Sequence, residues 1–154
     1  MGNLADRVFR ESVVDFVRVY TPLDGITNQE EFLTELLSQA RDIDAVWEPL
    51  GKPPKSGFQT RSCLYEHPSG ALAQLEQLLK TQLRKYFDEF ARKDCGFIQS
   101  FPKTFNLTAW FVRLAKGGHQ TEHIHASGWL SGVFYLRVPK PIDPEEGAIE
   151  LGLW

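Results

Sequence analysis

Two histidines one residue apart are the side chains in this sequence best suited to chemistry. In a strand, side chains alternate between faces, so His123 and His125 would point the same way. Imidazole is a ligand for Zn, Fe, Cu and Ni, and the spacing therefore indicates a shared metal ion. The alternative is a pair of surface histidines on a strand edge. His119 would lie on the same face but roughly 13 Å from His123 at about 3.3 Å per residue. We expect it outside the ligand set unless the chain bends at Gly117-Gly118.

The residues around the pair predict a β-rich segment that would position it. β-Branched and aromatic residues favour core strands at Phe105–Ala115, Gln120–Ile124 and Leu130–Val138, and the second of these carries the histidines. Gly117-Gly118 is expected to interrupt the β structure between the first two strands. A polar connection from Pro139 to Pro144 would then lead to a last strand, Ala148–Leu153.

One face of the third expected strand carries polar groups. Ser131, Tyr135 and Arg137 alternate with the apolar residues Leu136 and Val138. This polar face either looks into a pocket beside the histidines or faces solvent. In the first case the three residues are candidates to bind a co-substrate.

The first hundred residues read as helices and short strands. Val13–Tyr20 is expected to be a strand, and Asn28 followed by Glu31 is a capping-box pattern that would start a helix running to about Arg41. The segment 42–56 is expected to be a loop and 60–65 a short strand or turn. Ser69 would cap a longer helix over 71–92. Its apolar residues recur at spacings of three and four and predict one buried face: Leu72, Leu75, Leu79, Leu83, Tyr86, Phe87 and Phe90.

The motifs together resemble those of the 2-oxoglutarate/Fe(II)-dependent oxygenases. The resemblance rests on three stretches, Gly117-Gly-His-Gln-Thr-Glu-His-Ile-His125, Gly128-Trp-Leu-Ser-Gly-Val-Phe-Tyr-Leu-Arg-Val-Pro139 and Glu146-Gly-Ala-Ile-Glu150. It is strongest to the branch often found beside tetratricopeptide repeats. It is dense from Trp110 to Glu150 and weaker elsewhere.

This resemblance implies a fold, a cofactor set and a reaction. The fold would be α+β, with a double-stranded β-helix (jelly-roll, cupin-like) core and two main helices packed outside. The metal would be Fe(II), held by His123 and His125, with 2-oxoglutarate and O2 as co-substrates, and the reaction would be a hydroxylation. The substrate class would be a small molecule or a protein side chain. Residues 1–154 would form one domain, in which 1–100 support a core that begins at 101.

The sequence departs from the family pattern at two places. His125 stands where the wider superfamily usually has Asp or Glu. The family's distal histidine and its basic 2-oxoglutarate ligand would follow the region where the chain ends at Trp154. The resemblance therefore implies a core that is incomplete at its C-terminus and an enzyme only if the whole domain is present. Open sheet edges in such a fragment would favour self-association.

Composition excludes several other classes of protein. The 154 residues carry a net charge of −3 without a basic run, which argues against nucleic-acid binding, and no apolar run approaches the length of a membrane span. Two cysteines, Cys63 and Cys95, favour free thiols in a cytoplasmic protein. Two alternatives stay open. One is a cupin-type metal-binding protein, although Trp129 and Leu130 stand where the cupin motif needs Glu. The other is a non-enzymatic binding module.

Overall fold

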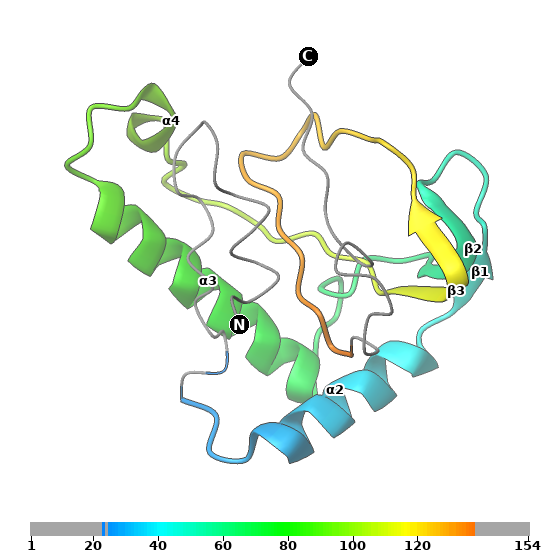
Figure 1. Cartoon of the computed structure of the whole chain (residues 1–154). Coiled ribbons are helices and arrows are strands. Elements are labelled where there is room, and N and C mark those ends of the chain that lie inside the picture. Colours follow the sequence, from blue (N-terminus) through cyan, green and yellow to red (C-terminus); the bar gives the residue numbers. More distant parts are fainter. Residues whose placement is uncertain (1–22, 24, 138–154) are drawn as a thin grey trace, which may run out of the picture. The chain divides into compact units, whose positions relative to one another are not determined.

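The computed structural model describes residue 23 and residues 25–137 and divides the chain into two compact units. The larger unit, 22–132, contains every helix and strand of the described residues, and the smaller one joins 1–21 to 133–154. The expected strands Val13–Tyr20 and Ala148–Leu153 lie outside the described residues. The larger unit contains helices and an antiparallel sheet of three strands in the order β1-β2-β3, which confirms a mixed α and β fold (Figure 1).

Helix α2, Gln29–Asp42, begins where its capping residue predicted. The Oδ1 atom of Asn28 accepts a hydrogen bond from the backbone N–H of Glu31 at 3.2 Å, and its Nδ2 donates to Glu31 Oε2 at 2.8 Å. One free N–H at the helix start is thus satisfied. Phe32, Leu36 and Ala40 are buried along one face, at the spacing of four that one side of a helix requires.

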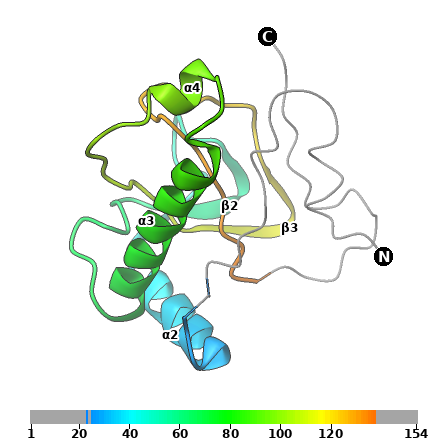
Figure 2. The same cartoon turned by 90° about the vertical axis from the view of Figure 1, so that its left-hand side faces the viewer.

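Helix α3, Gly70–Phe90, confirms the longer predicted helix, but its start is stabilised differently from our expectation. Ser69 is the N-cap residue and makes no side-chain capping hydrogen bond. Instead, Gln39 of α2 accepts a hydrogen bond from the Leu72 backbone N–H at 3.1 Å. A side chain of another helix therefore replaces the local cap, and the same hydrogen bond holds α2 against α3 (Figure 2).

Strand β1, Ala45–Trp47, and the start of β2, Pro54–Thr60, lie in the segment 42–56 that we expected to be a loop. They pair as an antiparallel hairpin, with Trp47 opposite Phe58. The two rings meet edge to face at 5.0 Å, and the guanidinium of Arg113 on β3 lies 4.6 Å from the Phe58 ring centroid. Such cross-strand aromatic and cation–π pairs stabilise a sheet. They explain why a hairpin forms here although four Pro and Gly residues favoured a loop. The short strand or turn expected at 60–65 corresponds to the end of β2 at Thr60 and a turn at 64–65.

Strand β3, Val112–Gln120, corrects the predicted division of this region. The Gly117-Gly118 pair lies inside the strand instead of between two strands. The ladder is irregular there, because Leu114 pairs with Gly57 whereas His119 pairs with Lys55. A Cβ at Gly118 would stand 2.5 Å from the Ser56 carbonyl oxygen, so glycine is what allows β3 to approach β2 so closely.

The segment after β3 has no strand among the residues that the structure describes. The expected strands Gln120–Ile124 and Leu130–Val138 were therefore wrong over 121–124 and 130–137. Of the strand expected at Phe105–Ala115, only 112–115 lies in the sheet. The described strands thus do not establish a double-stranded β-helix.

A short helix that the sequence had not suggested, α4, Gly96–Gln99, follows α3.

Cys63 and Cys95 are both free thiols, as predicted. Within residues 23 and 25–137, no helix is long and apolar enough to cross a membrane.

Candidate metal centre

His123 and His125 lie next to each other in the irregular segment that follows β3. Their ring centroids are 5.0 Å apart with an interplanar angle of 67°, and both side chains are exposed. The prediction that a strand brings them together was wrong, because this segment has no strand pairing. The bent chain nevertheless places the two imidazoles side by side.

A hydrogen bond to the backbone orients the ring of His123. Its Nδ1 atom lies 2.8 Å from the carbonyl oxygen of Thr121. A carbonyl only accepts hydrogen bonds, so this geometry favours the tautomer with the proton on Nδ1 and the lone pair on Nε2. A backbone partner on one nitrogen is the usual arrangement for a histidine whose other nitrogen binds a metal.

Thr121 is itself fixed to the β1–β2 hairpin. Its backbone N–H donates to the carbonyl oxygen of Pro53 at 2.9 Å, and its hydroxyl donates to the same oxygen at 3.3 Å. The His123 ring is therefore connected through two residues to the sheet. The one local sign of this contact in the sequence is a polar residue, Thr121, directly after a strand.

A tight turn follows His125. The backbone N–H of Gly128 donates to the His125 carbonyl oxygen at 2.9 Å, which closes a four-residue turn. The next residue, Trp129, stacks on Phe97 of α4 with a centroid distance of 4.1 Å and an angle of 9°. The segment thus runs from the sheet towards α4 (Figures 1 and 2).

An aromatic cluster receives Trp129. Phe101 meets the Trp129 ring edge to face at 5.0 Å and stacks on Phe87 of α3 at 4.4 Å. The Trp129 Nε1–H donates to the hydroxyl of Ser100 at 3.3 Å. Our sequence reading missed this cluster, although the spacing of four between Phe97, Phe101 and Phe105 was a signal for one apolar face.

The described residues bring no third metal ligand to the pair. Among residues 23 and 25–137, no group of three or more His, Cys, Asp or Glu side chains is arranged to hold a metal. His119 lies on β3 opposite Lys55, and its exclusion from the ligand set stays a prediction. Two imidazoles alone fit part of a ligand set, because the non-haem iron pattern combines two histidines with a carboxylate.

The candidate co-substrate residues Ser131, Tyr135 and Arg137 are all exposed. Ser131 belongs to the larger unit, and Tyr135 and Arg137 belong to the smaller one. Partial burial raises the pKa of Tyr135, so its phenol stays a hydrogen-bond donor at neutral pH. Their part in binding a co-substrate stays a prediction.

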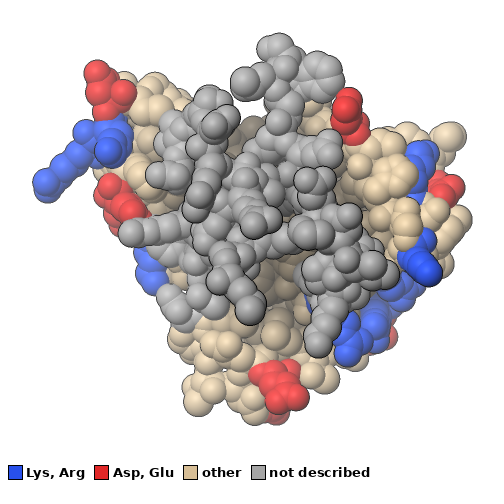
Figure 3. Space-filling view, in the orientation of Figure 1, with Lys and Arg blue, Asp and Glu red and all other residues tan. Residues whose placement is uncertain are grey.

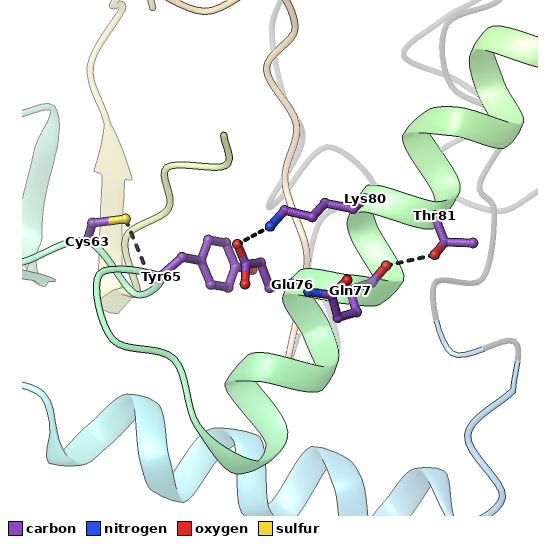
Figure 4. Close-up of polar contacts among 6 residues, drawn as sticks. All are labelled: Cys63, Tyr65, Glu76, Gln77, Lys80 and Thr81. Carbon is purple, nitrogen blue, oxygen red and sulfur yellow. Dashed lines mark hydrogen bonds and ion pairs between the residues drawn. The ribbon is translucent and has the colours of Figure 1, made fainter. Parts of the chain in front are cut away.

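A second polar cluster lies at α3, away from the histidine segment in sequence. Lys80 and Glu76 form an ion pair at 2.5 Å with little exposure, and the Tyr65 ring lies beside Glu76 (Figure 4). Burial, with the negative charge of Glu76 as the second cause, raises the pKa of Tyr65 to about 12. The Tyr65 backbone N–H donates to the sulfur of Cys63 at 3.4 Å. These contacts fasten the 63–65 turn to α3.

Charged side chains on the face shown in Figure 3 do not separate by sign. Basic and acidic residues both occur at the left and right edges of this view, among the coloured atoms. The coloured atoms of this face therefore form no basic patch that would favour a nucleic-acid partner.

Comparison with known proteins supports the resemblance drawn from the motifs. Residues 108–151 match the family described as "Putative 2OG-Fe(II) oxygenase". This stretch contains both histidines and the three candidate co-substrate residues. The match confirms the resemblance of this segment to a 2OG-Fe(II) oxygenase family, whose members generally use Fe(II), 2-oxoglutarate and O2. No match was found among curated proteins or among solved structures. An association with tetratricopeptide repeats stays a prediction.

Proposed function

We propose that this chain, as part of a whole oxygenase domain, acts as a non-haem Fe(II)/2-oxoglutarate-dependent dioxygenase, in which His123 and His125 are iron ligands. One observation carries the proposal: the two imidazoles lie 5.0 Å apart within the segment that matches the oxygenase family. The sheet of β1, β2 and β3 would be part of a double-stranded β-helix core. The substrate would be a small molecule or a protein side chain.

The residues of the segment fit two ligand positions of an iron site. The backbone carbonyl of Thr121 holds the Nδ1 proton of His123 and leaves Nε2 to face a metal. Both rings are exposed, so a metal and its co-substrates could reach them. When bound, iron with 2-oxoglutarate and O2 supplies the oxidising power that turns a C–H bond into C–OH, with release of succinate and CO2.

Ser131, Tyr135 and Arg137 are our candidates for holding the co-substrate. A guanidinium presents two parallel N–H donors to a carboxylate, which suits the acid groups of 2-oxoglutarate. A serine hydroxyl and a tyrosine hydroxyl can add neutral hydrogen bonds. Substitution of Arg137 by alanine would then weaken 2-oxoglutarate binding without reducing metal binding.

An anaerobic titration with Fe(II), or with Co(II) as a spectroscopic probe, tests the proposal. The unaltered protein, His123→Ala, His125→Ala and the control His67→Ala are compared. His67 is an exposed histidine outside the matched segment. We expect the first two substitutions to abolish binding and the control to leave it unchanged. Equal affinity in all four proteins would show that the pair is a surface feature.

Turnover separates the proposed enzyme from the alternatives. Decarboxylation of 2-oxoglutarate that requires iron and His123 supports the oxygenase. Metal binding without consumption of 2-oxoglutarate supports a cupin-type metal-binding protein. Absence of metal binding supports a non-enzymatic binding module.

A further inference from the structure

We infer that Trp129 is a positioning residue for the histidine pair: its ring fixes the far end of the 121–129 segment and so holds both imidazoles in place before a metal binds. The inference rests on the proposed function of His123 and His125. It concerns a residue that neither binds the metal nor touches it.

The near end of the segment is already fixed. Thr121 donates two hydrogen bonds to the Pro53 carbonyl oxygen and accepts one from the His123 ring. A single fixed end leaves the remaining residues free to swing. The segment therefore needs a second attachment to keep two rings at a fixed separation.

The chain offers such an attachment immediately after the pair. The turn from His125 to Gly128 is closed by a backbone hydrogen bond of 2.9 Å, and it delivers the chain directly to Trp129. No flexible stretch intervenes between the turn and the indole. Movement of Trp129 would therefore move the His125 backbone.

Three contacts of its ring attach Trp129 to the rest of the unit. The indole is stacked on Phe97, meets Phe101 edge to face and donates its N–H to Ser100. Aromatic contacts of this geometry contribute more to stability than the burial of their apolar area alone. A tryptophan N–H that is removed from water also needs a hydrogen-bond acceptor, and Ser100 supplies it. Trp129 is half-buried, whereas all residues from Thr121 to Gly128 are exposed. The segment has no buried side chain of its own, so the indole is what attaches this end of it.

Attachment of the segment at both ends has a consequence for metal binding. Removal of a residue that orients the ligands of a metal typically lowers the metal affinity about ten- to hundredfold. A ligand pair held at both ends loses less freedom on binding than a pair on a free loop. Loss of the indole should accordingly weaken metal binding although both imidazoles remain.

The test compares Trp129→Leu with Trp129→Phe and with the control Phe90→Leu. Phe90 is another half-buried aromatic residue with an aromatic neighbour, Tyr86, but it lies on α3. We expect Trp129→Leu to lower Co(II) affinity about tenfold or more. Trp129→Phe keeps the stack and should retain most of the affinity, and Phe90→Leu should leave it unchanged at temperatures well below unfolding. Equal affinity in Trp129→Leu and Phe90→Leu would overturn the inference.

A readout without metal separates this inference from the proposed function. In the metal-free protein, NMR cross-relaxation between the ring protons of His123 and His125 reports their proximity. We expect this signal in the unaltered protein and its loss in Trp129→Leu. Its persistence in Trp129→Leu would refute the positioning role, whatever the metal results. Failure of the unaltered protein to bind Co(II), with the NMR result as expected, would instead refute the iron site and leave the anchoring intact.

A second variant covers the case in which Trp129→Leu does not fold. Phe97→Leu removes the stacking partner from α4 and leaves the indole and both histidines in place. It should reduce the cross-relaxation signal and the Co(II) affinity in the same direction. Unchanged values in a folded Phe97→Leu protein would overturn the inference.

Discussion

Gly118 lies against the backbone of β2, and a Cβ at this position would stand 2.5 Å from the carbonyl oxygen of Ser56 and 3.1 Å from that of Lys55. Both neighbours are backbone atoms, which cannot rotate away as a side chain can. The close approach occurs where the ladder between β2 and β3 changes register. It fixes the end of β3 from which the histidine segment departs.

Substitution of Gly118 by alanine should therefore destabilise the protein. The added methyl group must displace the backbone of Ser56, and overpacking of this kind typically costs about 1–3 kcal/mol. Gly132→Ala is a matched control, because a Cβ there meets nothing within 4 Å. Chemical denaturation measures both free energies of unfolding. An equal change in the two variants would contradict the close approach.

The raised pKa of Tyr65 predicts a loss of stability at alkaline pH. The pKa is about 12 in the folded protein and 10.0 in the unfolded chain, so between these values the folded state retains a proton that the unfolded state has released. Stability therefore falls as the pH rises from about 10 to about 12. Tyr65→Phe should flatten this part of the pH profile. The free energy of unfolding, measured by chemical denaturation at several pH values in both proteins, checks this, and an identical dependence on pH in the two proteins would refute the shift.

A carboxylate at position 125 should preserve the proposed iron site. His125→Asp restores the residue type usual in the wider superfamily and supplies the anionic ligand of the two-histidine, one-carboxylate pattern when a further histidine is present. We expect His125→Asp to retain Fe(II) binding that His125→Ala loses. The comparison is made by anaerobic titration, with His67→Ala as the neutral control. Unchanged Fe(II) binding in both variants at position 125 would show that this side chain is not a ligand.

Self-association through a sheet edge is a further expectation. Within the described residues, β3 is paired on one side only, with β2. Unpaired backbone groups of an edge strand recruit other chains, and lysine on the edge opposes this. Ala115→Lys should reduce self-association, which is measured as the rise of the sedimentation coefficient with protein concentration. Gln74→Lys, an exposed position on α3, adds the same charge away from the sheet and should not. Sedimentation unaffected by Ala115→Lys would argue against pairing through β3.

The two main helices followed from sequence because their signals are local. Asn28 with Glu31 marked the start of α2, and apolar residues at spacings of three and four marked α3. These patterns report one face of a helix directly. The cap of α3 was not predictable in the same way, because Gln39 reaches it from another helix.

The strands were harder to predict because their pairing depends on distant residues. Trp47 and Pro54 stand in a segment rich in Pro and Gly, and only the contact of Trp47 with Phe58 and of Phe58 with Arg113 shows why it forms a hairpin. At the candidate site, the spacing of His123 and His125 correctly suggested proximity but for the wrong reason. The proximity comes from a bent segment attached at Thr121 and Trp129, and both attachments are made to partners far away in the sequence, Pro53 and Phe97.

The register change in β3 separates two parts of the strand that can vary independently. Leu114 and the residues before it keep their pairing with β2 through Gly57, while His119 pairs with Lys55 beyond the irregularity. Shortening or lengthening the chain between Leu114 and His119 therefore need not shift the first part of the ladder. Such a length change would reset the direction in which the histidine segment leaves the sheet, so this short stretch is where evolution or protein engineering can re-aim the segment while preserving the scaffold.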